Sequence, residues 1–482
     1  MTEVKSASEN SFVNGNVKEL GEFDDLSIDP VKEAKLVRKL DRFILPMFCV
    51  IYFLSFLDRS NIGNAKIVGL DDQLGLTQSQ YSTAVSVFYA TYICVEIPGV
   101  LLVKRLGPHR FITIALVCWS LVTIFTCFVR SYGTLVLTRL LLGLFEGSVF
   151  PSQSLYITMT YKRQEQAKRL GWLYVCSCAS GAFGGLIATG ITKIKPRGDF
   201  LSWSWLYVIE GCISLCAGVW VWFGLPDDPT KAKFLTEEEK HMMSIRAEQQ
   251  RRYMGNQKFD KKEVIKAFID PKVAISCLMQ FSVDLVLYGF STFLPSILKL
   301  QLGYDTMAAQ YLSVPVYAVA AISVGSVSFI SDRYNIKWPL ILGLNTLGMI
   351  GYIILLTSKK GGVNYFATYL IAFPLYGSVG LSITWLNNNM APHYRRATAL
   401  GCNQTIGNLA GVVAGQIYRK SPYKLGNSFS LGCSVMGMIC SVVMVKYLHY
   451  ENSSKQKIMD GDKVDKKVER TGSDALDFKY VY

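Results

Sequence analysis

Residues 43–65 read FILPMFCVIYFLSFLDRSNIGNA, and this stretch decides the fold class. The apolar run before Asp58 is shorter than the roughly 20 residues that a helix needs to cross a bilayer. A helix that crosses must therefore carry Asp58 and Arg59 into the outer half of the membrane. Because a charged side chain at the bilayer centre costs roughly 2.5–3.5 kcal/mol on insertion scales, this pair needs a partner, a cavity or a function.

The composition of the whole chain is typical of a protein that crosses the membrane many times. Of its 482 residues, 50% are hydrophobic and only 18% are charged, whereas soluble chains average about 25% charged residues. This composition excludes a disordered chain, a coiled coil, collagen and a disulfide scaffold. The net charge of +14 comes from basic residues between the apolar runs, so we expect no nucleic-acid partner.

The cysteines and histidines limit the chemistry further. All 12 Cys lie in apolar runs, where they act as small hydrophobic residues, and the 4 His lie in or beside polar connections. These positions predict neither a metal site nor a histidine relay within the membrane, and they disfavour an enzyme such as an acyltransferase. Proton chemistry in the bilayer would have to use carboxylates, with the proton as coupling ion and no cofactor.

Apolar runs of helical length predict twelve membrane-spanning helices and an all-α fold. They cover residues 43–62, 81–103, 111–129, 134–157, 170–192, 203–224, 272–298, 311–331, 338–357, 365–387, 398–418 and 428–448. The predicted organisation is two six-helix halves, at 43–224 and 272–448, with a polar central loop at 225–271 and tails at 1–42 and 449–482.

The polar segments carry two further predictions. Thr236 and Glu239 read as a capping box, which predicts a short helix from there to about Arg252. The tail from Glu451 is polar and is predicted to be unstructured. Most of the 50 Lys and Arg fall in the tails, the central loop and the connections on the same side. The positive-inside rule therefore predicts that both tails are cytoplasmic.

Several short motifs resemble those of the anion:cation symporter family of the major facilitators, in particular its fungal allantoate-permease branch. They are FLDRSNIGNA at 56–65, Glu96-Ile97-Pro98, Arg139 with Leu142-Gly143 and Glu146-Gly147, Trp203-Ser204-Trp205 with Glu210-Gly211, LPDDP at 225–229, and Asn387-Asn388 with Arg395-Arg396 and Gly407-Asn408. The resemblance implies the major facilitator fold, with a substrate site near the midplane between the halves. It also implies that acidic and basic residues of the first and fourth spans link anion binding to proton entry.

The first and fourth spans hold the strongest candidates for a site. Helix geometry places Asp58 and Arg139 at similar depths, so that an ion pair between them is possible, and Glu146 falls on the same face as Arg139. Arg59 can offer a bidentate fork to a substrate carboxylate, while Asp58 and Glu146 can gain and lose protons. The alternative is a fixed ion-pair network that holds the two helices together.

Other polar residues are weaker candidates. The possible substrate contacts are Tyr89, Tyr92, Tyr288, Ser382, Trp385, Gln404 and Asn408, and Asp284 is a possible functional carboxylate. Glu96, Glu210, Asp332 and Arg333 are expected in gates or helix packing. The small-residue runs 181–185 and 407–415 predict close helix packing.

The function expected from these features is proton-coupled uptake of a small organic anion, with nicotinate or a similar monocarboxylate as the first guess. An efflux carrier or an intracellular exchanger would use the same residues, and a nutrient receptor that binds without transport is a third reading. We expect a monomer in the lipid bilayer, in the plasma membrane, with the endoplasmic reticulum or the vacuole as the alternatives.

Overall fold

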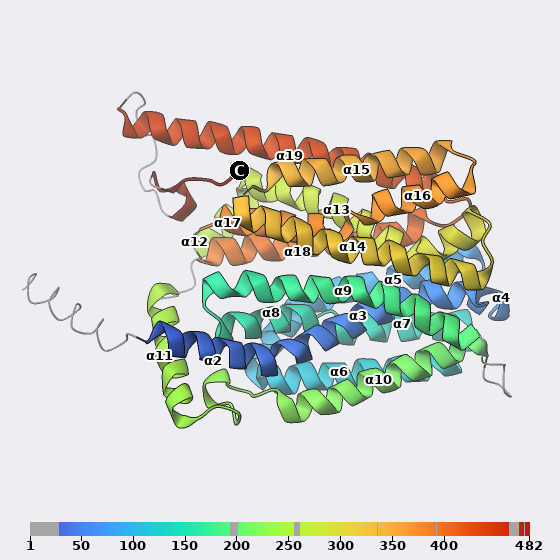
Figure 1. Cartoon of the computed structure of the whole chain (residues 1–482), viewed down its shortest axis with the longest axis horizontal. Coiled ribbons are helices and arrows are strands. Elements are labelled where there is room, and N and C mark those ends of the chain that lie inside the picture. The colour runs from blue at the N-terminus through green and yellow to red at the C-terminus, as the bar shows by residue number, and fades with distance from the viewer. Residues whose placement is uncertain are drawn as a thin grey trace, which may run out of the picture.

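The computed structural model describes residues 28–192, 201–254, 261–334, 336–391, 393–461, 472–476 and 478–482. Within these residues the protein is helical, with no strand. Figure 1 shows the helices as two stacked groups that run in roughly the same direction. Helix α2 and residue 482 lie at the same end of the bundle, which we call the terminal end; the other is the α4 end.

The first half contains six membrane-crossing stretches. Its helices are α2 (Pro30–Phe43), α3 (Leu45–Ile67), α4 (Leu70–Gln73), α5 (Gln78–Leu106), α6 (Pro108–Phe125), α7 (Tyr132–Glu146), α8 (Val149–Thr160), α9 (Arg163–Thr192) and α10 (Ser202–Gly224). Helix α5 begins at a capping box of Thr77 and Gln80, and α7 at one of Ser131 and Thr134. The fourth stretch is broken into α7 and α8 directly after Glu146.

The second half follows the same plan. Its helices are α13 (Pro271–Ser296), α14 (Thr306–Tyr334), α15 (Trp338–Thr357), α16 (Gly361–Ala372), α17 (Leu375–Asn388), α18 (His393–Ile417) and α19 (Lys424–Met459). The tenth stretch is broken at Phe373 and Pro374, at the position that matches the break after Glu146. Ten helical segments of the described residues are long and apolar enough to cross a membrane. Helices α5 and α18 are also long enough to cross, and they pack against each other between the halves. Together with the ten they make twelve membrane-crossing stretches.

The two halves meet mainly through α3 with α13, α5 with α18, and α9 with α14. Small residues allow these close approaches. A Cβ atom on Gly63 of α3 would lie 2.1 Å from the Thr292 carbonyl oxygen of α13, and one on Gly411 of α18 would lie 2.3 Å from the Tyr89 ring of α5. Gly181 faces Tyr317 in the same way. The close packing predicted for runs 181–185 and 407–415 is confirmed.

Hydrogen bonds also join the halves toward the α4 end. Lys299 Nζ donates to the Ile67 carbonyl oxygen at 2.8 Å. Ser86 Oγ donates to the Val412 carbonyl oxygen at 2.8 Å and accepts from Gln416 Nε2 at 2.9 Å. These contacts hold the α4 ends of the two halves together.

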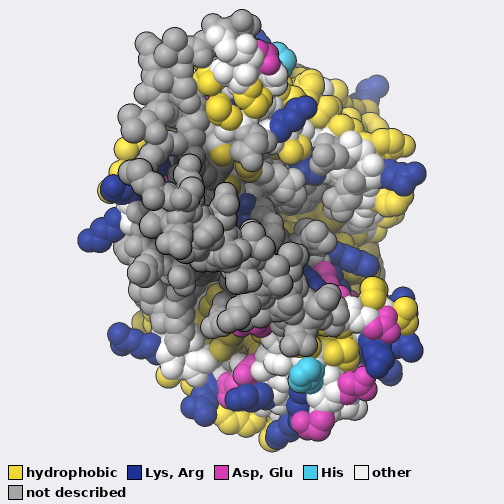
Figure 2. All heavy atoms as spheres, turned by 90° about the vertical axis from the view of Figure 1, so that its left-hand side faces the viewer, with side chains coloured by type: hydrophobic (Ala, Val, Ile, Leu, Met, Phe, Trp, Pro, Cys, Tyr) yellow, Lys and Arg dark blue, Asp and Glu magenta, His cyan; other side chains and the backbone are white. Residues whose placement is uncertain are grey.

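The central loop folds onto the first half at the terminal end. Helix α11 (Glu237–Met254) begins at the predicted capping box, because the Thr236 amide donates to Glu239 Oε2 at 2.8 Å. The prediction of this helix is confirmed. Arg246 of α11 pairs with Glu33 of α2 and with Glu165 of α9. Figure 2 shows the mixture of basic and acidic side chains that results in the lower part of this end. Helix α12 (Lys261–Ile269) leads into the second half.

The segment after α19 packs against the second half, contrary to the prediction of an unstructured tail from Glu451. Helix α19 continues to Met459, and Tyr480 is buried. The Tyr480 hydroxyl accepts a hydrogen bond from Lys272 Nζ at 3.0 Å and donates to the Ser473 carbonyl oxygen at 2.6 Å. Burial raises the pKa of Tyr480, which keeps the hydroxyl protonated. The prediction failed because it used local polarity, whereas the partners of this segment come from α13, α17, α18 and α19.

Candidate functional site

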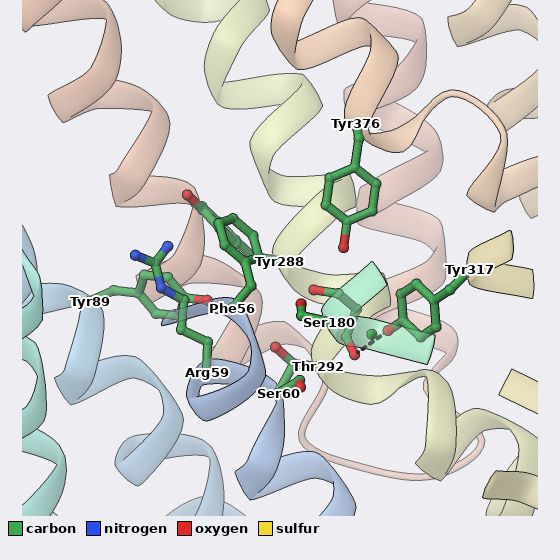
Figure 3. Close-up of a pocket in the computed structure, with 11 residues that line it drawn as sticks. Phe56, Arg59, Ser60, Tyr89, Ser180, Tyr288, Thr292, Tyr317 and Tyr376 are labelled. Atoms are coloured by element: carbon green, nitrogen blue, oxygen red, sulfur yellow. Dashed lines mark hydrogen bonds between the residues drawn. The ribbon is translucent and has the colours of Figure 1, made fainter. Parts of the chain in front are cut away.

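A pocket lies between the two halves and holds Arg59 among aromatic and hydroxyl side chains (Figure 3). Its side chains nearly fill it in this conformation, and the remaining volume of about 10 Å³ is roughly that needed by one water molecule. Its walls come from α3, α5, α9, α13, α14 and α17. The lining residues are Phe56, Arg59, Ser60, Tyr89, Ser180, Gly181, Tyr288, Ser291, Thr292, Tyr317 and Tyr376.

Arg59 is bound to a carboxylate that comes from the same half. Its Nε donates to Glu146 Oε1 at 2.6 Å, and Ser55 Oγ donates to the same oxygen at 2.5 Å. The Glu146 side chain is fully buried, and that of Arg59 is 8% exposed. The other carboxylate oxygen, Glu146 Oε2, has no hydrogen-bond partner among the described residues. Glu146 therefore balances the charge of Arg59 and still has an oxygen that can carry a proton.

Aromatic rings surround the guanidinium group. Its carbon lies 4.8 Å from the ring centre of Phe56, 4.7 Å from that of Tyr92 and 5.8 Å from that of Phe88. These cation–π contacts favour the charged side chain in a place where little water reaches it. Tyr92 therefore holds Arg59 and is not itself a lining residue of the pocket.

The position of Glu146 follows from the glycines beside it. Gly143 and Gly147 pack against α5, where a Cβ atom would lie 2.3 Å from the Phe88 carbonyl oxygen and 2.5 Å from that of Tyr92. Only a residue without a side chain allows α7 to come this close to α5. The close approach holds the end of α7 beside α3, so that Glu146 reaches Arg59.

Asp58 and Arg139 are not paired with each other, so the predicted ion pair is wrong. Asp58 accepts hydrogen bonds from Trp119 Nε1 at 2.5 Å and from Asn61 Nδ2 at 3.2 Å, and the same Asn61 amide contacts Glu210. Arg139 instead donates to the Tyr207 hydroxyl at 2.6 Å. Similar depths along two helices do not make two residues partners, because side-chain direction decides the contact, and α3 turns Asp58 toward Trp119 of α6.

A hydrogen-bonded chain crosses between the halves next to the pocket. The Tyr288 hydroxyl of α13 donates to Asn408 Oδ1 at 2.8 Å, and Asn408 Nδ2 contacts Glu96 Oε2 of α5 at 3.4 Å. The rings of Tyr288 and Tyr89 lie 4.8 Å apart. Glu96 thus lies at the interface of the halves, where Asn408 connects it to a residue of the pocket wall.

Asp284 has a local partner, because Gln280 Nε2 donates to its carboxylate at 2.9 Å. Gln404, which shares a helix face with Asn408, has a buried Oε1 atom without a partner among the described residues. Neither residue lines the pocket.

Ser382 and Trp385 lie away from the pocket, so the expected stacking surface is wrong for this pair. Trp385 Nε1 donates to the Val481 carbonyl oxygen at 2.9 Å, and its ring is buried with Met279 and Tyr480. Ser382 is buried on the same face. The two residues share a helix face, as predicted. On this face Trp385 contacts the segment after α19, whose packing the sequence did not reveal.

Asp332 and Arg333, which were expected in a gate or in helix packing, lie at the end of α14. Arg333 is exposed at the end of α14, and the side chain of Asp332 lies outside the described residues.

Sequence reasoning missed several residues of the pocket and of the Arg59–Glu146 pair beside it. Ser55 could have been found, because it lies one helical turn before Arg59 on the same face. Tyr317, Tyr376 and Ser180 gave no signal, since a tyrosine or serine in an apolar helix is more often a packing residue.

Two packed halves of six membrane-crossing helices, with a buried polar pocket between them, define a membrane transporter. The chain belongs to the Major Facilitator Superfamily, whose family model matches residues 48–415. Its relatives in this family are transporters, and the protein is a transporter and not an enzyme.

Relatives of known sequence cover nearly the whole chain. A Schizosaccharomyces pombe protein named only as an uncharacterized transporter is 62% identical over 461 residues, which covers 96% of each chain. The high-affinity nicotinic acid transporter of Saccharomyces cerevisiae is 35% identical over 458 residues, which covers 93% of this chain and 85% of that protein. A crystal structure of a D-xylose-proton symporter has the same fold, with a TM-score of 0.65 at 15% identity over 83% of this chain and 96% of that one.

Proposed function

We propose that the protein is a proton-coupled importer of a small organic monocarboxylate, of the allantoate-permease branch, with nicotinate as the first substrate to test. The single observation that carries the proposal is the buried Arg59–Glu146 pair at the edge of the pocket. An arginine in this place can bind a carboxylate, and a carboxylate beside it can take up a proton.

The pair supplies a mechanism of coupling. With Glu146 ionised, its carboxylate occupies Arg59 Nε and neutralises the charge of the guanidinium group. When Glu146 takes up a proton, the attraction between the two side chains falls and Arg59 can turn its donors to an incoming carboxylate. Loss of the proton on the other side of the membrane restores the pair and expels the anion. Substrate and proton therefore travel together.

Glu146 is the better candidate for the proton site than Asp58. Glu146 is paired with Arg59, which lines the pocket. Both oxygens of Asp58 instead accept hydrogen bonds from Trp119 and Asn61. We propose Asp58, Arg139 and Glu210 as a supporting network, in which Asp58 is a second candidate for proton uptake.

The substrate class rests on the pocket and on one relative. Arg59 accounts for the carboxylate, and the aromatic walls suit a small planar body. The relative named as a nicotinic acid transporter supports nicotinate as the first test compound.

The orientation and the membrane are also proposals. Lys and Arg side chains surround the terminal end (Figure 2), which supports a cytoplasmic location for this end. We propose the plasma membrane as the site of uptake. An exchanger of an intracellular membrane is the second candidate, because the same residue pair serves transport in either direction.

Uptake of labelled nicotinate and pantothenate tests the proposal, at external pH 4.5 and 7.5, in cells that express the wild type or Glu146→Gln. We expect accumulation of one acid at pH 4.5 in the wild type and its loss in the variant. The variant should still exchange labelled for unlabelled acid across the membrane, since exchange needs no net proton movement. Uptake that depends on neither pH nor Glu146 would refute symport.

A further inference from the structure

We propose that Tyr376 is a specificity-determining residue that hydrogen-bonds a second polar atom of the substrate, at the end of the pocket away from Arg59. The inference rests on the proposed function and deepens it. It narrows the substrate class from small monocarboxylates to planar acids that carry a heteroatom in or on the ring.

The hydroxyl of Tyr376 is free although its side chain is buried. Tyr376 is 2% exposed, and its hydroxyl has no hydrogen-bond partner among the described residues. Figure 3 shows the side chain reaching from α17 into the pocket with the hydroxyl foremost. Because the hydroxyl opens into the pocket, a ligand atom that accepts its hydrogen bond is favoured over one that leaves it unpaired.

Three other hydroxyl groups of the pocket already have acceptors in the protein. Tyr317 donates to the Ser291 carbonyl oxygen at 3.0 Å, and Ser180 to that of Ser177 at 2.7 Å. Ser60 donates to the Leu57 carbonyl oxygen at 2.9 Å. Among these four hydroxyl groups, that of Tyr376 alone has no acceptor among the described residues and remains for a ligand.

Tyr376 and Arg59 line the same pocket from opposite halves of the protein. The Phe56 ring lies between them, 4.8 Å from the guanidinium carbon and 6.3 Å from the Tyr376 ring. A small planar acid that lies along Phe56 would place its carboxylate at Arg59 and its far edge toward Tyr376. Because α3 and α17 belong to different halves, such a ligand would also connect the halves.

The test compares nicotinate with benzoate, which has the same shape but lacks the ring nitrogen. Initial uptake rates of both labelled acids are measured at pH 4.5 for wild type, Tyr376→Phe and the matched control Tyr317→Phe. We expect the wild type to prefer nicotinate at least tenfold in kcat/KM. Tyr376→Phe should lower that preference to about twofold or less with benzoate uptake unchanged, and Tyr317→Phe should keep the preference.

The outcomes separate this inference from the proposed function. Wild-type uptake of both acids without preference, or a preference that survives in Tyr376→Phe, overturns the role of Tyr376 and leaves proton-coupled uptake standing. An equal loss of both acids in Tyr376→Phe would show a role in packing only and also overturns it. If the wild type takes up neither of these acids nor pantothenate at either pH, the proposed function and the role of Tyr376 both fail.

Discussion

Arg59 and Glu146 are 87 residues apart in the sequence, and their side chains meet at 2.6 Å between α3 and the end of α7. The contact joins the first and fourth membrane-crossing stretches of one half and borders a pocket shared with the other half. A change in the charge of Glu146 therefore acts directly on the residue proposed to bind the substrate.

Replacement of Arg59 by lysine should reduce uptake of the transported acid at least tenfold. Lysine keeps the positive charge but loses the planar fork and the ring contacts with Phe56 and Tyr92. The measurement is the initial uptake rate at pH 4.5, normalised to the amount of protein at the membrane. Uptake within twofold of the wild type would show that charge alone is sufficient, and that the fork has no role.

Gly63→Ala should abolish transport. The new methyl group would lie 2.1 Å from the Thr292 carbonyl oxygen, so α3 and α13 could no longer approach as they do here. The matched control is Gly190→Ala, where nothing lies within 4 Å of the added atom. We expect a loss of uptake of more than tenfold for the first variant and less than twofold for the second. Equal uptake by the two variants would contradict a functional close approach.

Asn61→Ala should lower the stability of the protein by about 1–3 kcal/mol, because two buried carboxylates lose the amide that contacts both. Thermal unfolding of the purified protein in detergent measures the effect. Adding Glu210→Gln should restore part of the loss, since an amide in place of one carboxylate removes the repulsion with Asp58. A double variant no more stable than Asn61→Ala would rule out the proposed charge conflict.

Tyr480→Ala should destabilise the second half by about 3–5 kcal/mol, the usual cost of removing a buried aromatic ring. Tyr480→Phe keeps the ring but leaves Lys272 without the hydroxyl, and we expect a smaller loss of about 1–3 kcal/mol. Met459→Ala, at a half-exposed site of α19, is the control and should change little. Thermal unfolding again provides the comparison, and identical curves for all three variants would mean that the segment does not contribute to stability.

The sequence allowed the fold to be predicted because membrane spans depend on length and hydropathy, which are local properties. It also singled out Arg59 and Glu146, since buried charges are rare in apolar helices. The partner of each charge was less predictable: Asp58 and Arg139 have similar depths, yet they point to Trp119 and Tyr207. Trp385 was misplaced for a related reason, because its partner Val481 lies 96 residues further along the chain.

The packing of residues 472–482 against the second half has a consequence for the order in which the protein folds during its synthesis. Lys272, at the start of α13, is buried, and its partner Tyr480 is made 208 residues later. Arg395 pairs with Asp270 and gains its second partner, Asp474, only later in synthesis. The second half can therefore insert helix by helix, but its terminal end stays incomplete until the ribosome has passed these residues. A chain that stops early would leave Lys272 and Arg395 with Asp270 as their shared partner and without the cover of this segment, a feature by which cellular quality control could distinguish it from the finished transporter.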